Sequence, residues 1–179
     1  VPVASRLAPG GLVAVWVTNA ARTADLLLGT AGPAAGGGGG VFAEWGVEPV
    51  GEWVWLKITA AGEPVVPPGS AWRKPWERLL IARRKRTGAG TGAAGMEVEA
   101  EGGRGRRTRP VAGKVIAAVP DVHSRKPNLR ALFEEELLPE RYEALEVFAR
   151  NLTAGWWAWG DEVLLFQRRE CWVEEEKGE

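Results

Sequence analysis

The sequence is poor in the residues that build disulfides and metal sites. Among its 179 residues are one cysteine, Cys171, and one histidine, His123. A single cysteine excludes an internal disulfide, and the usual zinc sites need several cysteine or histidine ligands. We therefore expect neither a disulfide framework nor a metal site.

Long apolar runs and an excess of charge of one sign are also missing. No run reaches the roughly eighteen apolar residues that a membrane-spanning helix needs. The first residues, VPV, lack the basic region and cleavage pattern of a signal peptide. The 23 basic residues balance the 23 acidic ones, so any surface that attracts nucleic acid must be local. We expect no membrane association.

What the sequence does contain is enough apolar material for one domain with a core. Hydrophobic residues make up 45% of the chain, and ten are tryptophans. A tryptophan buries a large area in a core, and it also stacks on bases and other rings. Both interpretations stay open for each tryptophan.

The apolar pattern predicts strands that alternate with helices. Asn19 is a candidate helix cap, since its side chain can accept from the first free amides. Alternation of this kind favours an α/β domain with a mainly parallel sheet. The expected strands are 12–18, 48–59, 77–83, 114–119, 143–149 and 162–167, and the expected helices are 20–28, 41–45 and 128–138.

Two low-complexity segments interrupt this pattern, at about 29–40 and 84–113. The first is rich in glycine, alanine and proline, and the second in glycine and arginine. Neither composition can bury a core. We interpret both as disordered insertions within one domain.

Polar residues follow the strand predicted at 143–149. Arg150 and Asn151 lie just beyond its carboxyl end, where ligands bind in open α/β sheets. Lys126 stands near the start of a predicted helix and suits a cofactor carboxylate, while Asp161 and Glu162 suit ribose hydroxyls. The alternative for each is an ordinary solvated side chain. Their clustering along the chain favours a nucleoside-cofactor site.

A second cluster mixes aromatic and basic residues. It consists of Trp72, Arg73, Lys74 and Trp76. Tryptophan can stack on a base, and arginine or lysine can contact phosphate. A loop packed by two tryptophans with exposed charges explains the pattern equally well.

Several motifs together resemble one family, the S-adenosylmethionine-dependent adenine-N6 methyltransferases of RNA and DNA, and within it the methyltransferase-like protein 4 branch. They are VWVTN at 15–19, GEWVWLKIT at 51–59, GEPV at 62–65, KPWE at 74–77, HSRKP at 123–127, FARNL at 148–152, and GW at 155–156 through WGDEVL at 159–164. They cover nearly the whole chain outside the two insertions.

The resemblance implies a Rossmann-like methyltransferase sheet and S-adenosyl-L-methionine as cofactor. It implies that the cofactor-binding residues are Lys126, Phe148, Arg150, Asn151, Asp161 and Glu162. It also implies RNA or DNA containing adenine as the partner, and a nuclear, in part cytoplasmic, location.

The sequence departs from the family at three points. Asp161 replaces a usual asparagine, and Val54 replaces a histidine common in this branch. The third departure is an absence, because the catalytic motif Asp-Pro-Pro-Trp occurs nowhere in the 179 residues. The chain starts without methionine, at a segment that aligns just downstream of that motif. We therefore expect residues 1–179 to be the C-terminal part of one methyltransferase domain, with no catalytic residue of its own.

Three hypotheses follow. The parent protein methylates adenine N6 in RNA or DNA, while this chain alone is inactive. Alternatively, the chain is a non-catalytic methyltransferase-like module that binds nucleic acid, or a gene fragment that does not fold stably. Sequence leaves open the choice of RNA or DNA, the target sequence and the oligomeric state.

Overall fold

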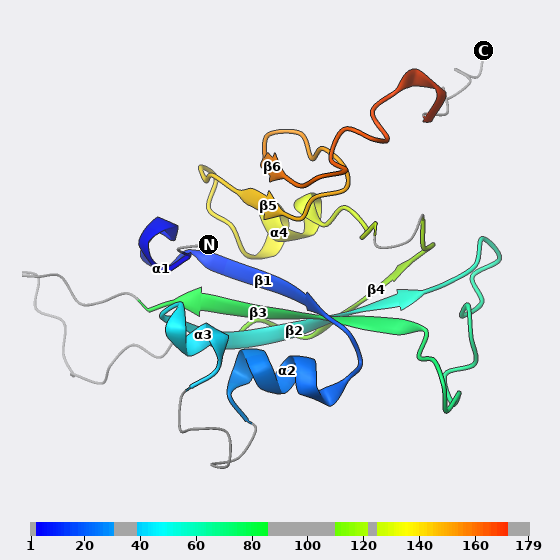
Figure 1. Ribbon diagram of the computed structural model, residues 1–179, viewed down its shortest axis with the longest axis horizontal. Coiled ribbons are helices and arrows are strands. Elements are labelled where there is room, and N and C mark those ends of the chain that lie inside the picture. The colour runs from blue at the N-terminus through cyan, green and yellow to red at the C-terminus, as the bar shows by residue number, and fades with distance from the viewer. Residues whose placement is uncertain (1–2, 31–38, 86–109, 122–124, 172–179) are drawn as a thin grey trace, which may run out of the picture. The chain divides into compact units, whose positions relative to one another are not determined.

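The computed structural model describes residues 3–30, 39–85, 110–121 and 125–171. The chain is mixed α/β and forms two compact units, residues 1–117 and 118–179 (Figure 1). None of the helices within the described ranges is long and apolar enough to cross a membrane. In chain order the helices and strands are α1 (Val3–Arg6), β1 (Leu12–Val17), α2 (Ala21–Leu28), α3 (Val41–Glu44), β2 (Val47–Lys57), β3 (Trp76–Arg84), β4 (Lys114–Ala118), α4 (Arg130–Glu136), β5 (Leu145–Val147), β6 (Trp157–Trp159) and the 3-10 helix η2 (Arg169–Cys171).

The first unit is built on a sheet with the strand order β1-β3-β2-β4. Both β1 and β2 pair with β3 in the antiparallel sense, so the prediction of a mainly parallel sheet is wrong here. The reason is that residues 58–75 return the chain directly from β2 to β3 as a long hairpin connection. Since β1 and β2 both oppose β3, they run in the same direction, with α2 and α3 as the crossover between them.

The helices α2 and α3 cover one face of this sheet. Their buried residues Leu27 and Phe42 pack with Leu80 and Ala82, which point to one side of β3. The alternate residues of β3 point to the other side, where Ile81 and the neighbouring Trp53 of β2 are fully buried. Because side chains on both faces of β3 are buried, its central residues form a continuous apolar run in the sequence. Trp53 and Trp55 are thus core residues.

Asn19 does not cap α2. The residue before the helix is Ala20, and no side chain caps it. The amide of Asn19 instead donates to the backbone oxygen of Trp76 at 2.5 Å and ties the end of β1 to the start of β3. At the C-terminus Gly29 adopts the left-handed conformation that ends many helices.

The two predicted insertions lie mostly outside the described residues, which omit 31–38 and 86–109. Gly29 and Gly40 lie in close contact, since a Cβ on Gly29 would come within 2.3 Å of the Gly40 nitrogen. The second insertion is shorter than predicted at its end: Val111 donates its amide to Val50, and Ala112 accepts from the Trp53 indole at 3.1 Å. Residues 110–113 therefore belong to the packed structure.

Cross-strand ion pairs stabilise the exposed parts of β2 and β3. Arg78 contacts both carboxylate oxygens of Glu52, at 2.6 and 2.7 Å. These hydrogen bonds lower the pKa of Glu52, against the opposing effect of its partial burial. The pair is bidentate, the geometry in which a surface ion pair contributes most.

We expect Glu52→Gln to lower the free energy of unfolding by about 1 kcal/mol at neutral pH. Because the pKa of Glu52 is lower in the folded state, the stabilisation is present above the ordinary value of 4.5 and is lost as the pH falls through the lowered value. Urea unfolding across this pH range measures the difference. The control is Glu48→Gln, whose more exposed pair with Lys85 should contribute less. An equal loss at every pH would contradict the assignment.

The second unit contains α4 and a two-stranded sheet in which β5 and β6 are parallel. The strand predicted at 162–167 is wrong, because these residues form turns in which Leu165 donates to Glu162 and Gln167 to Leu164. The strand lies earlier, at Trp157–Trp159, where aromatic side chains suit a pleated sheet. Strand 143–149 and helix 128–138 are present in shorter form.

Candidate functional site

The strands β5 and β6 end at the same edge of their sheet. They are parallel, with Val147 opposite Trp159, so the residues that follow each strand emerge together. The amide of Ala149 donates to the Trp159 oxygen at 3.1 Å, which extends the contact past the strands. Five predicted cofactor residues lie here: Phe148, Arg150 and Asn151 after β5, and Asp161 and Glu162 after β6. We call these five residues the polar edge.

Gly160 lets the two chain segments of the polar edge approach closely. A Cβ at this position would lie 2.2 Å from the oxygen and 2.8 Å from the nitrogen of Ala149. Both atoms belong to the backbone, which cannot rotate away as a side chain can. Glycine is therefore required where the chain leaves β6.

The two segments are also joined by an ion pair. Arg150 donates through Nη1 to a carboxylate oxygen of Glu162. The side chains are 31% and 37% exposed, so the pair is reachable from solvent and not sealed in a core. One nitrogen of the guanidinium is thereby held, and among the described residues the other donors of Arg150 make no hydrogen bond.

Arg125 fixes the third member of the polar edge. Its Nε donates to Asn151 Oδ1 at 2.7 Å, and its Nη1 lies 2.6 Å from Asp121. The guanidinium also lies over the ring of Phe166, 4.4 Å from the ring centre. Arg125 is a residue that the sequence pattern did not indicate. The available signal was its place beside Lys126 in the HSRKP motif.

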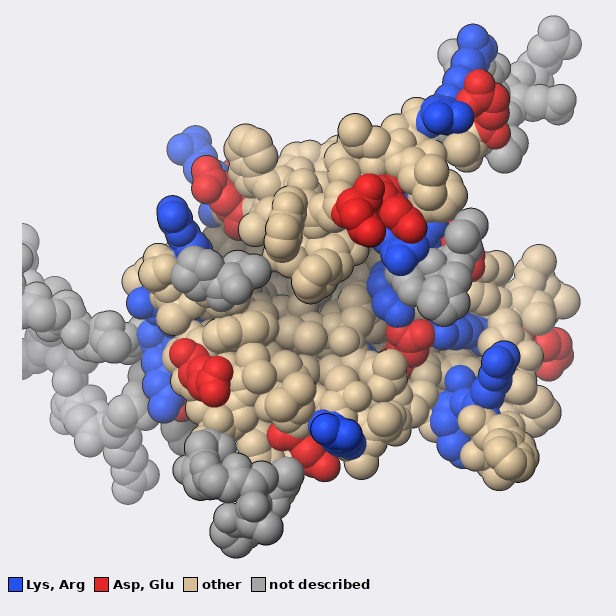
Figure 2. All heavy atoms as spheres, viewed as in Figure 1, with Lys and Arg blue, Asp and Glu red and all other residues tan. Residues whose placement is uncertain are grey.

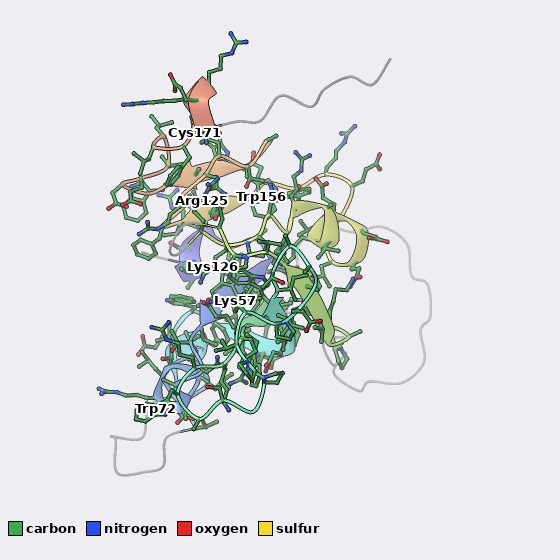
Figure 3. All side chains as sticks on the ribbon, turned by 90° about the vertical axis from the view of Figure 1, so that its right-hand side faces the viewer. Lys57, Trp72, Arg125, Lys126, Trp156 and Cys171 are labelled. Atoms are coloured by element: carbon green, nitrogen blue, oxygen red, sulfur yellow. The ribbon has the colours of Figure 1, made fainter. Side chains whose placement is uncertain are left out.

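Lys126 follows Arg125 in the chain and is half-buried (Figure 3). The side chain of its neighbour Arg125 contacts Asn151 of the polar edge. Asp161 lies at the same edge and is exposed to solvent. Of the six sequence-predicted cofactor residues, five lie at the polar edge, and Lys126 belongs to the same unit of the fold.

Phe148 has a strained backbone at the start of the polar edge. Its φ angle is 61°, in the left-handed region that non-glycine residues rarely occupy. The side chain is 80% exposed, and its ring lies 6.0 Å from that of Trp159, itself 58% exposed. Strain of this kind tends to occur at functional sites. The two rings present an apolar surface beside the charged groups.

Glu146 is an acidic residue that sequence reasoning missed. It lies within β5, and its partial burial raises the pKa of its carboxyl group. The hydroxyl of Thr153, a buried residue, donates to it at 3.4 Å and offsets part of this effect. Its position between the apolar neighbours Leu145 and Val147 was the available signal.

A network of side chains holds α4 to the segment before β6. The indole of Trp156 donates to the Tyr142 hydroxyl at 2.9 Å, and that hydroxyl donates to Glu134 at 2.5 Å. Arg130 contacts the same carboxylate at 2.8 Å and reaches the backbone of Ala154. The pKa of Glu134 is lowered, first by Tyr142 and then by Arg130. Trp156 therefore has a structural role, in the contact between α4 and the segment before β6.

The aromatic and basic cluster lies in the first unit, at the connection from β2 to β3. Trp72 is 96% exposed and lies at the outer edge of the view in Figure 3. Trp76 begins β3 and is half-buried, with the Lys74 ammonium 5.6 Å from its ring centre. Arg73 is exposed, and basic groups lie over this connection at the right of Figure 2. Of the two tryptophans, Trp72 has its ring open to solvent.

Comparison with known proteins gives a consistent result. The MT-A70 family matches residues 1–162. The N6-methyladenosine RNA methyltransferase MTA1 of Cryphonectria parasitica is 53% identical over 175 residues, which are 97% of this chain and 44% of that protein. The N(6)-adenine-specific methyltransferase METTL4 of Homo sapiens is 34% identical, over 99% of this chain and 34% of its own length. The DNA N6-methyl methyltransferase of Caenorhabditis elegans is 30% identical, over 87% of this chain and 35% of its own length. The chain spans less than half the length of these relatives.

Proposed function

Since the chain belongs to the MT-A70 family, we propose that the whole protein transfers a methyl group from S-adenosyl-L-methionine to N6 of adenine in RNA or DNA. The observation that carries the proposal is the polar edge, where five residues predicted to bind the cofactor meet at the ends of two parallel strands. The names of the relatives support the reaction, with RNA for one and DNA for another. We also propose a Rossmann-like methyltransferase fold for the whole domain, on the basis of family membership.

The chemistry of the polar edge fits the cofactor. S-adenosylmethionine carries a carboxylate, ribose hydroxyls and a flat adenine. Lys126 and Arg150 supply cations for the carboxylate, and Asp161 and Glu162 supply acceptors for the hydroxyls. The exposed rings of Phe148 and Trp159 supply an apolar face for the base.

When bound, the cofactor supplies a methyl group on a sulfonium centre. The role of this chain's residues is to hold that group in one position, since alignment of two reactants supplies much of the rate enhancement in such transfers. No Asp-Pro-Pro-Trp occurs in the 179 residues, so we assign no catalytic residue within them. The role of this part of the protein is to bind the cofactor and to position its methyl group.

The proposal is tested by measuring S-adenosylmethionine binding to the full-length protein by calorimetry. We expect Lys126→Ala and Asp161→Ala each to weaken binding about tenfold, since each removes one polar contact with the cofactor. Arg141→Ala, at an exposed basic position in the same unit, is the matched control for lost charge. Binding that both site variants leave unchanged would contradict the assigned pocket.

The nucleic-acid partner is assigned to the exposed cluster of Trp72, Arg73, Lys74 and Trp76. We expect Trp72→Ala to weaken binding of single-stranded RNA about tenfold, because a base that stacks on the ring loses its support. Fluorescence anisotropy at several salt concentrations gives both the affinity and its electrostatic part. The control is Trp157→Ala, which removes an exposed tryptophan from β6. Equal losses for the two variants would argue against the cluster.

A second candidate function is a non-catalytic module that binds nucleic acid. Two observations favour it: the aspartate at 161 in place of the family's usual asparagine, and the exposed ring of Trp72. It predicts RNA binding without cofactor binding. The calorimetric measurement above therefore separates the two functions.

A further inference from the structure

Asn151 is held in one orientation by its neighbour. Arginine has only hydrogen-bond donors, so the group of Asn151 that faces Arg125 Nε at 2.7 Å must be the amide oxygen. The amide nitrogen lies on the opposite branch of the same planar group. Among the hydrogen bonds of the described residues, none is donated by Asn151 Nδ2. The side chain therefore presents its NH2 group as a donor, while its oxygen is engaged by Arg125.

Arg125 is itself well fixed. Asp121 holds Nη1 at 2.6 Å, the ring of Phe166 lies against the guanidinium plane, and the side chain is only 18% exposed. A guanidinium held on two sides has little freedom to turn away from Asn151. The residues 121, 125, 151 and 166 all belong to the second unit, so the arrangement is contained within one compact part of the chain.

We infer that Arg125 is a positioning residue, which holds Asn151 with its NH2 group toward the bound cofactor as a hydrogen-bond donor. The inference rests on the proposed function, because it takes the polar edge as the cofactor site. Asn151 then recognises a hydrogen-bond acceptor of the cofactor. The acceptors that S-adenosylmethionine offers are the ring nitrogens of adenine, the ribose oxygens and the carboxylate oxygens. Without Arg125 the amide can flip, and its donor is presented only part of the time.

A double-mutant cycle in the full-length protein tests the inference. Calorimetry measures the Kd of S-adenosylmethionine for the wild type, Arg125→Gln, Asn151→Ala and the double variant. If Arg125 acts through Asn151, Arg125→Gln weakens binding about fivefold, Asn151→Ala about tenfold, and the double variant no more than Asn151→Ala alone. The control is Arg141→Gln, which removes an exposed arginine elsewhere in the same unit and leaves the Kd within about twofold.

Additive losses in the double variant, or an Arg125→Gln protein that binds as the wild type does, would overturn the inference. If Arg125 had only a structural role, Arg125→Gln would lower the melting temperature, and the losses of affinity in the double variant would be additive. If Arg125→Gln does not fold, Arg125→Lys replaces it in the same cycle, since it keeps the charge and a donor near Asn151. Failure of the wild type to bind S-adenosylmethionine contradicts the proposed function instead, so the two failures are distinguishable.

Discussion

Replacing Gly160 with alanine is expected to destroy the polar edge and to destabilise the second unit by about 3 kcal/mol or more. The added Cβ would lie 2.2 Å from the Ala149 oxygen, where real Cβ contacts below 3.0 Å are essentially never seen. Since the obstructing atoms are backbone, the ends of β5 and β6 must separate. Arg150 then loses its position opposite Glu162.

The measurement is thermal unfolding together with S-adenosylmethionine binding by the Gly160→Ala protein. Gly155→Ala is the matched control in the same unit, because Gly155 has a positive φ of 75° but the nearest atoms to its Cβ would belong to the Arg130 side chain, from 3.4 Å. It should cost about 1 kcal/mol, from backbone strain alone. Equal effects of the two substitutions would show that the close contact at Gly160 is not essential.

Reversal of the charge at Arg150 is expected to give the largest loss of cofactor binding among the side chains of the polar edge. In Arg150→Glu, two carboxylates face each other where Glu162 now meets a guanidinium. The same change removes a cation proposed to hold the cofactor carboxylate. Hydrogen bonds between charged groups contribute about 1.5 to 3 kcal/mol, so we expect affinity to fall about thirtyfold or more.

The swapped double variant, Arg150→Glu with Glu162→Arg, separates the two roles of Arg150. It restores an ion pair between the same two positions and should recover the melting temperature of the second unit. It should not recover cofactor affinity, because the charges that face the ligand have exchanged places. Full recovery of affinity would mean that Arg150 only holds the fold and does not bind the cofactor.

Sequence reasoning worked best where one local rule decides the structure. The apolar run at 12–18 and the long aromatic segment at 48–59 become β1 and β2, and the helix expected at 20–28 becomes α2. It failed where contacts with residues distant in the sequence decide the structure. The antiparallel sense of β3 depends on its neighbours in the sheet, and Asn19 turns from the helix to Trp76, 57 residues away.

The strand predicted at 162–167 is wrong for a different reason. The prediction rests on the run Val163-Leu164-Leu165-Phe166. Four apolar residues in a row are typical of a buried strand, yet here Phe166 packs on Arg125 and Leu164 is 66% exposed. The aromatic residues before Gly160 form the strand instead. Periodicity alone cannot choose between two adjacent short apolar segments.

For the polar edge, sequence order predicted which residues gather but not how they pair. Arg150 and Glu162 are twelve positions apart, and only the parallel register of β5 and β6 brings them into contact. Arg125 and Asn151 are 26 positions apart. The strain at Phe148 and the raised pKa of Glu146 depend on packing, which no local pattern encodes.

The most direct test of the central claim is a methyl-transfer assay with the full-length protein. The protein is incubated with S-adenosylmethionine that carries a labelled methyl group and with RNA or DNA oligonucleotides that contain adenine, and the nucleosides are separated by mass spectrometry. The account predicts label on N6 of adenine, greatly reduced in the Arg150→Glu protein. A correctly folded protein that binds both the cofactor and the nucleic acid and forms no N6-methyladenine would contradict it.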